Sequence, residues 1–222
     1  MKRSSRGSLD DGFKRNQNSL KHKIIPMQDR NKLIKIFLEK NSQINLSAIR
    51  DEEGVRVKHI QDSLELYKVL RLQKHRQVCD VGTGGGFPLL PLAISNPDVS
   101  FIGVDSVGKK VKAVNLMIEE LGLKNVKALR LRAENYTTKF DVVTARAVAY
   151  MDKLLPRVVP LVRQGGHICL YKQFSEDEKK ELLSLCKRFS LKLEKEHKYS
   201  LFEGDPAKDG AGVERVIYVL KK

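Results

Sequence analysis

Apolar residues recur with helical spacing in two segments near the start of the chain. They form a first group, Leu33, Ile36 and Phe37, and a second group, Val57, Ile60, Leu64 and Tyr67. Residues three and four apart share one face of an α-helix, so each group predicts a helix with one buried side. Both helices precede the first strongly apolar strand. We therefore expect residues 24–75 to form an N-terminal helical segment that packs against a sheet without joining it.

From residue 76 onward the pattern alternates between short apolar runs and helical stretches. Strands are expected at 77–81, 99–104, 126–131, 140–144 and 166–171, with two more near 191–193 and 213–220. Helices are expected from about residue 86, at 108–121 and at 176–187. Such alternation predicts an α/β fold, in which a mostly parallel, doubly wound sheet carries helices on both faces. We assign residues 76–222 to this domain.

The charge of the chain is strongly positive. Lys and Arg number 42 against 27 Asp and Glu, which gives a formal net charge of +15. This charge favours an anionic partner, first of all nucleic acid; the alternative is a basic surface that only keeps the protein in solution. Residues 1–23 are rich in Lys and Arg and lack apolar periodicity, so we expect a basic, disordered arm without catalytic residues.

The cysteines and the hydropathy pattern exclude several protein classes. Cys79, Cys169 and Cys186 are too few and too irregularly spaced for a disulfide framework or a CxxC zinc pair. They fall in apolar strands and a helix, so we interpret them as core residues and expect no metal site. No apolar run approaches the roughly 20 residues of a membrane span, and the start of the chain lacks a secretory signal. We expect a cytoplasmic monomer with no membrane partner.

A glycine-rich turn follows the first predicted strand. Residues 80–86 read D-V-G-T-G-G-G. Glycines let the backbone approach a ligand closely, and an α/β sheet binds adenosine-bearing ligands at the carboxyl ends of its strands. The spacing D-x-G-x-G-x-G differs from the dinucleotide fingerprint G-x-G-x-x-G, which disfavours a nicotinamide oxidoreductase. It resembles the first motif of the Rossmann-like methyltransferases, and this resemblance implies S-adenosylmethionine as the cofactor, with Gly82 and Gly84 leaving room for its carboxypropyl chain.

Three further polar positions follow later strands. Asp105 ends the second strand, where such folds place an acid that accepts the ribose hydroxyls; a helix N-terminal acid is the alternative. Ala133 and Glu134 follow the third strand, near the expected adenine edge, and Arg146 follows the fourth. Because the carboxyl ends of parallel strands meet at one edge of a sheet, we expect these residues to converge there.

Several phrases together are typical of one family. They are NLSAIRD (45–51), HIQDSLEL (59–66), DVGTGGGFPLLPLAI (80–94), VDSVGKKVKAVN (104–115), RAENY (132–136) and TARAVA (144–149). From about residue 28 to its end, the chain resembles the GidB/RsmG family, bacterial enzymes that methylate guanine N7 in small-subunit ribosomal RNA. The resemblance implies a Rossmann-like S-adenosylmethionine methyltransferase fold, with S-adenosylhomocysteine as a product. It also implies these cofactor contacts: Gly82, Phe87, Ala133, Glu134 and Arg146, with Asp105 on the ribose.

The residues agree with guanine N7 as the acceptor. Enzymes that methylate exocyclic amines commonly carry Asn or Asp followed by Pro-Pro and an aromatic residue at the fourth strand, but this chain has T-A-R-A at 144–147. Methylation of pyrimidine C5 needs a cysteine nucleophile, and the cysteines here are interpreted as core. Guanine N7 carries a lone pair at neutral pH, so no general base is expected. Arg146 is the candidate that positions substrate and cofactor. His59 and Asp62 are interpreted as structural.

Basic residues fall where RNA would need them. Arg132 follows the third strand and Lys172 ends the fifth; Arg215 lies at the same edge if the last strand is antiparallel. These three are the candidate RNA-binding residues, although each could be an ordinary ion-pair partner. The expected partner is small-subunit ribosomal RNA or the 30S particle. Three alternatives stay open: a methyltransferase of another RNA, a methyltransferase of a small molecule, and a non-catalytic RNA-binding relative.

Overall fold

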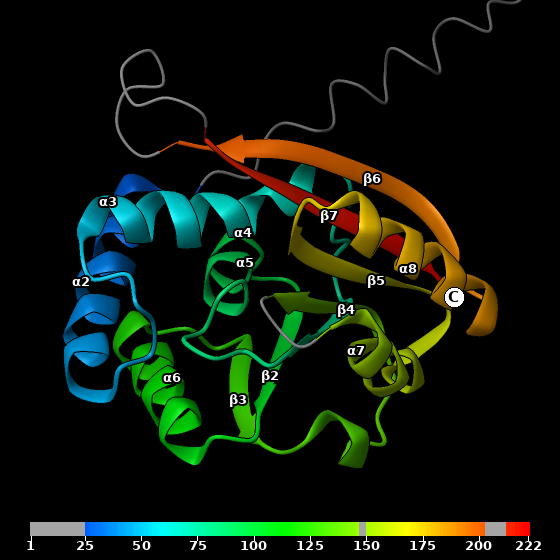
Figure 1. The fold of residues 1–222 in the computed structure, drawn as a ribbon. Helices are drawn as coiled ribbons and strands as arrows, with labels where there is room; N and C mark the ends of the chain where they lie inside the picture. The colour runs from blue at the N-terminus through cyan, green and yellow to red at the C-terminus, as the bar shows by residue number, and fades with distance from the viewer. Residues whose placement is uncertain (1–24, 147–149, 203–211) are drawn as a thin grey trace, which may run out of the picture.

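A computed structural model describes residues 25–146, 150–202 and 212–222. Figure 1 shows a central sheet with helices on both faces. The basic arm predicted at residues 1–23 lies outside the described residues. The seven strands are β1 (Gln77–Val81), β2 (Ser100–Asp105), β3 (Val126–Arg130), β4 (Phe140–Arg146), β5 (Val162–Gln173), β6 (Lys192–Leu201) and β7 (Val213–Lys221).

The sheet order is β3-β2-β1-β4-β5-β7-β6. The first five strands in the sequence are parallel, whereas β7 is antiparallel to both of its neighbours, β5 and β6. This arrangement confirms the predicted α/β fold with a mostly parallel, doubly wound sheet. It also confirms the antiparallel last strand on which the placement of Arg215 depended. The carboxyl ends of β1 to β5 lie at one edge, which we call the carboxyl edge.

The longer helices are α2 (Met27–Ile44), α5 (Leu89–Ser95), α6 (Gly108–Leu121), α7 (Met151–Val158) and α8 (Glu176–Arg188). A composite helix precedes β1 and joins α3 (Glu52–Gly54), the π-helix η1 (Val55–Gln61), α4 (Asp62–Leu64) and the 3-10 turn η2 (Glu65–Lys68). Single 3-10 turns η3 (Ala133–Asn135) and η4 (Val159–Leu161) lie after β3 and before β5. Within the described residues, no helix is long and apolar enough to cross a membrane.

The two predicted N-terminal helices are present and pack on one face of the sheet. Leu33 and Phe37 of α2 and Ile60 of the composite helix are buried in the same apolar cluster as Val78 of β1. The cluster includes Met117 of α6, the helix on which α2 packs. Residues 25–75 therefore share a core with the sheet, and the domain boundary at residue 76 stays a prediction.

The local predictions differ from the structure in a few places. The helix expected from about residue 86 begins only at Leu89, because positive φ angles at Gly82, Gly84 and Gly86 keep the preceding turn out of helical geometry. Helix α7 was not predicted. Strand β5 is longer than the expected 166–171 and begins at Val162.

The cysteines lie in the core, as predicted. Cys79, Cys169 and Cys186 are free and buried. Burial raises the pKa of the Cys79 and Cys169 thiols well above the ordinary value, which keeps both thiols protonated and unreactive. Across the described ranges, no group of three His, Cys, Asp or Glu side chains could hold a metal ion.

Candidate active site

The glycine turn after β1 has a backbone that only glycine adopts easily. Gly82, Gly84 and Gly86 have φ angles of 70°, 54° and 90°. A Cβ atom strains the backbone in this region, so the motif needs glycine for its geometry as well as for ligand approach. The amide of Gly82 donates to the Val104 carbonyl at 2.8 Å, which holds the turn against the end of β2.

Asp105 at the end of β2 fixes the other side of the turn. Its Oδ2 accepts a hydrogen bond from the Gly84 amide at 2.9 Å, and its Oδ1 accepts one from the Val107 amide at 2.8 Å. The second bond goes to Val107, which precedes α6, and among the described residues no side chain caps the N-terminus of this helix. A carboxylate offers about four lone-pair positions, so two remain for the hydroxyls of a ribose. A ribose contact at Asp105 therefore stays a prediction, and the cap geometry of α6 does not support the alternative of a helix N-terminal acid.

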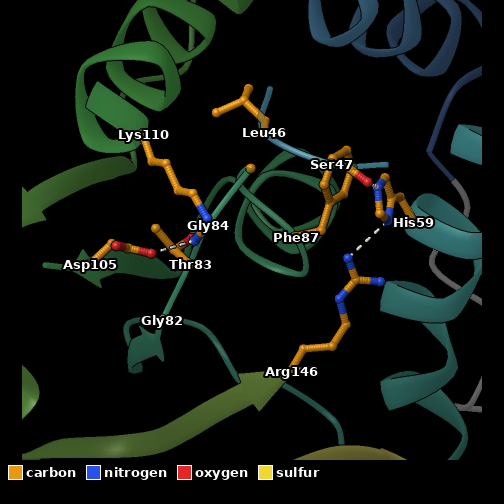
Figure 2. A pocket seen from close by; sticks show the side chains of 11 residues that line it. Leu46, Ser47, His59, Gly82, Thr83, Gly84, Phe87, Asp105, Lys110 and Arg146 are labelled. Carbon is orange, nitrogen blue, oxygen red and sulfur yellow. Dashed lines mark hydrogen bonds between the residues drawn. The ribbon is translucent and has the colours of Figure 1, made fainter. Parts of the chain in front are cut away.

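Two adjoining cavities open at the carboxyl edge. The first has a volume of about 450 Å³, and the second of about 240 Å³. The first is lined by Leu46, Ser47, His59, Gly82, Thr83, Gly84, Gly85, Phe87, Asp105, Lys110 and Arg146 (Figure 2). The second is lined by Val81, Gly82, Val104, Asp105, Ser106, Leu131, Arg132, Ala133, Glu134, Leu154 and Arg157. Gly82 and Asp105 line both, so the two cavities adjoin at the glycine turn. The structure thus places every predicted cofactor contact in one or both of these adjoining cavities.

Arg146 ends β4 and is anchored on the composite helix. Its Nη1 donates to the Lys58 carbonyl at 2.8 Å and to Oδ2 of Asp62 at 2.9 Å. Its Nη2 lies 2.9 Å from Nδ1 of His59, and its guanidinium lies 5.8 Å from the centre of the Phe87 ring. Three hydrogen bonds and a cation–π contact hold the guanidinium in one orientation beside the first cavity.

His59 forms the wall of the cavity opposite Asp105 (Figure 2). Its ring stacks on Phe87 with a centroid distance of 4.6 Å, and its Nε2 lies 3.0 Å from Oγ of Ser47. Burial, together with the positive charge of Arg146, lowers the pKa of His59 to about 3. His59 is therefore neutral at physiological pH. It lies in η1, and π-helical turns occur frequently at functional sites.

Asp62 contacts Arg146 and accepts hydrogen bonds from several donors. Besides Arg146, it accepts hydrogen bonds from the Tyr199 hydroxyl at 2.5 Å and from Nε and Nη2 of Arg215, both at 3.3 Å. Asp62 is 1% exposed, so these partners compensate a charge that water does not reach. From the sequence, His59 and Asp62 were interpreted as structural, but His59 lines the first cavity and Asp62 holds Arg146. The HIQDSLEL phrase was the signal that could have included them.

The three candidate RNA-binding residues all lie at the carboxyl edge but differ in their partners. The Arg132 side chain is 69% exposed and only 3.9 Å from a Glu134 oxygen. Lys172 is mostly buried and forms an ion pair with Glu178 at 2.5 Å. Arg215 is paired with Asp62, as described. Whether they contact RNA stays a prediction, and Arg132 is the most accessible of the three.

The acid of the glycine motif, Asp80, is buried behind the turn. Its Oδ1 accepts a hydrogen bond from the Thr144 hydroxyl at 2.8 Å, which ties the end of β1 to the end of β4. Burial raises the pKa of Asp80 to about 6. Asp80 therefore supports the turn from behind and does not line either cavity.

Known proteins resemble this chain in sequence and in fold. A model of the GidB family, described as rRNA small subunit methyltransferase G, matches residues 27–203. The ribosomal RNA small subunit methyltransferase G of Lysinibacillus sphaericus is 35% identical over 202 residues, which are 86% of this chain and 80% of that protein.

Two solved structures show the likeness in fold. A precorrin-6Y C5,15-methyltransferase from Geobacter metallireducens has a TM-score of 0.56 at 14% identity, over 72% of this chain and 87% of its own. NSun6 from Pyrococcus horikoshii, solved with the S-adenosylmethionine analogue SFG, has a TM-score of 0.55 at 16% identity, over 66% of this chain and 48% of its own. At such low sequence identities, these structures support a similarity of fold and nothing more.

Proposed function

The chain belongs to the GidB family, rRNA small subunit methyltransferase G, and we propose that this S-adenosylmethionine-dependent enzyme methylates N7 of a specific guanine in small-subunit (16S) ribosomal RNA. One observation carries the proposal. The glycine turn, Asp105 and Arg146 line two adjoining cavities at the carboxyl edge, beside the exposed side chain of Arg132. This combination suits a nucleoside cofactor on one side and an anionic substrate on the other.

The residues present fit S-adenosylmethionine. Gly82 and Gly84 would lie against its carboxypropyl chain, because neither carries a side chain at the turn. Asp105 would accept the ribose hydroxyls through its remaining lone pairs. Ala133 and Glu134, in the second cavity, would face the adenine, and Phe87 and Arg146 would border the sulfonium. When bound, the cofactor supplies the methyl group and leaves as S-adenosylhomocysteine.

The chemistry requires positioning more than proton transfer. Guanine N7 has a lone pair at neutral pH, so no side chain has to remove a proton from it. Holding the nitrogen in line with the methyl group can supply roughly 7 to 11 kcal/mol of the barrier reduction. Arg146 is suited to this role because Asp62, His59 and the Lys58 carbonyl hold its guanidinium at the cavity. Neutral His59 adds no positive charge beside the cationic sulfonium.

The substrate contacts are proposed from charge and position. Arg132, Lys172 and Arg215 lie at the carboxyl edge, and the whole chain has a formal charge of +15. Phosphates would bind Arg132 directly, whereas at Lys172 and Arg215 they would compete with Glu178 and Asp62. We propose that the protein acts as a cytoplasmic monomer on ribosomal RNA or the 30S particle.

The alternatives make different predictions. A small-molecule methyltransferase would share the cofactor cavities but would have no use for the cationic edge. A non-catalytic RNA-binding relative would bind RNA without needing an intact glycine turn, and this turn is intact. Mass mapping of methylated guanines in ribosomal RNA from cells with and without the gene decides among them, because only the proposed function predicts the loss of one N7-methylguanosine from the small subunit.

A further inference from the structure

The hydrogen bonds between Arg146, His59 and Ser47 have a defined direction. A guanidinium only donates, so Nδ1 of His59, 2.9 Å from Nη2 of Arg146, must be the acceptor. A neutral imidazole carries one proton, which therefore resides on Nε2. Nδ1 also lies 3.3 Å from the Lys58 carbonyl oxygen. Nδ1 and this oxygen both accept hydrogen bonds from Arg146, so no hydrogen bond joins them to each other.

The direction of these hydrogen bonds determines whether the Ser47 hydroxyl can donate or accept a further hydrogen bond. The Nε2–H group of His59 donates to Oγ of Ser47 at 3.0 Å, and the Ile49 amide donates to the same oxygen at 3.1 Å. A hydroxyl oxygen has two lone pairs and one proton, so both lone pairs are used and only the proton remains. Within the described residues, no acceptor takes a hydrogen bond from this hydroxyl, and Ser47 lines the first cavity.

The position of Ser47 favours the substrate over the cofactor. Figure 2 shows Ser47 and His59 on one side of the cavity, with Asp105, Gly84 and Lys110 on the other. Asp105 and Gly84 are among the cofactor residues proposed above, and Lys110 lies beside them. A hydrogen-bond acceptor near Ser47 would therefore belong to the substrate, which would lie on the side of the cavity formed by the composite helix.

We propose that Ser47 donates a hydrogen bond to O6 of the target guanine and thereby selects guanine over adenine. The proposal rests on the proposed function. O6 and N7 are the two acceptors on one edge of guanine, so a base that presents N7 for methylation presents O6 beside it. Adenine carries an amino donor at that position, which would meet the proton of Ser47. Arg146 and His59 act as positioning residues here, since they fix the direction of the hydroxyl.

The test removes the Ser47 hydroxyl and the guanine O6 atom, separately and together. A 16S RNA is ligated with either guanine or 2-aminopurine, which keeps N7 but lacks O6, at the mapped target position. Single-turnover methyl transfer is measured on both RNAs with the wild type, Ser47→Ala and Ser47→Thr. Ser42→Ala is the matched control, because the Ser42 hydroxyl donates to a carbonyl of its own helix, at Glu39. Should Ser47→Ala fail to fold, Ser47→Cys replaces it, since a thiol is a weak donor.

The guanine-to-2-aminopurine rate ratio of the wild type should exceed that of Ser47→Ala by about 10-fold, the value of one hydrogen bond of about 1.4 kcal/mol. Ser47→Thr and Ser42→Ala should keep the wild-type ratio, and calorimetric affinity for S-adenosylmethionine should be unchanged in Ser47→Ala. Equal ratios in the wild type and Ser47→Ala would overturn the proposal, as would a loss of cofactor affinity as large as the loss of rate. A wild type that leaves the guanine RNA unmethylated would instead refute the proposed function.

Discussion

The carboxylate of Asp62 and the guanidinium of Arg146 form a buried ion pair, with Oδ2 2.9 Å from Nη1. The pair joins the composite helix to the end of β4, two elements that are far apart in the sequence. Its side chains are 1% and 12% exposed, so water screens it little. The orientation of the proposed positioning residue therefore depends on a residue that does not itself line the cavity.

Asp62→Asn should slow methyl transfer by about 10-fold or more with little change in cofactor affinity, because a positioning group acts mostly in the transition state. It should also lower the free energy of unfolding by about 3 to 5 kcal/mol, since it breaks a buried ion pair. Asp141→Asn is the matched control. Asp141 is also mostly buried and pairs with Arg76 and Arg163, at the opposite edge of the sheet. A similar loss of kcat in folded Asp141→Asn would mean that Asp62 acts only through stability.

Gly82→Ala should abolish or strongly weaken binding of S-adenosylmethionine. Gly122→Ala serves as its control, because both glycines have similar positive φ angles, 70° and 72°. Because the φ angles are similar, both variants carry similar backbone strain, about 1 to 2 kcal/mol. A Cβ at Gly122 would meet nothing within 4 Å, whereas Gly82 lines the cavity. Calorimetric titration measures the affinities. Equal affinities in the two folded variants would contradict the proposal that S-adenosylmethionine binds at the glycine turn.

Arg132→Ala should flatten the salt dependence of RNA binding by about 0.7 to 0.9 in log-log slope, the contribution of one phosphate contact. Lys74→Ala is the control. Its side chain is 76% exposed, pairs with Asp98, and precedes β1 at the opposite edge of the sheet. The two slopes are measured by titration of ribosomal RNA at several salt concentrations. If Lys74→Ala changed the slope and Arg132→Ala did not, the proposed RNA surface would be misplaced.

The pKa of His59 predicts a pH dependence of stability. Its pKa is about 3 in the folded state, against an ordinary 6.5, so the unfolded chain binds more protons between these values. The stability contributed by neutral His59 should be complete above about pH 6.5 and decline as the pH falls toward 3, by about 5 kcal/mol in total. His59→Gln cannot titrate. The difference in unfolding free energy between wild type and His59→Gln should therefore shrink on acidification, and a constant difference would mean that folding does not lower the pKa of His59.

Most of the fold followed from the sequence, because the strands and helices carry strong apolar periodicity. Strand β1 and helix α6 have the predicted bounds, and the N-terminal helices pack as expected. Helix α7 was missed although Met151, Leu154, Leu155 and Val158 have helical spacing and are buried. Pro156 inside it and its length of 8 residues weaken a local signal.

The sequence predicted the part of the candidate site that follows the ends of the parallel strands, but not the part that comes from the composite helix. Gly82, Asp105 and Arg146 follow parallel strands, so the rule that such ends converge was sufficient. His59 and Asp62 reach Arg146 from a helix 84 or more positions away in the sequence, and no spacing encodes that contact. Likewise, the sequence could not show that Glu178 pairs with Lys172, since this ion pair depends on how α8 packs beside β5.

The central claim is tested most directly with the purified protein, S-adenosylmethionine and 30S particles or 16S RNA from cells that lack the gene. Nuclease digestion and mass spectrometry then locate the methyl group. We predict one N7-methylguanosine, at the same position that loses its methyl group in those cells, and its absence with Arg146→Ala. Methylation at another atom or in no ribosomal RNA, by a wild type that binds S-adenosylmethionine, would contradict the assignment.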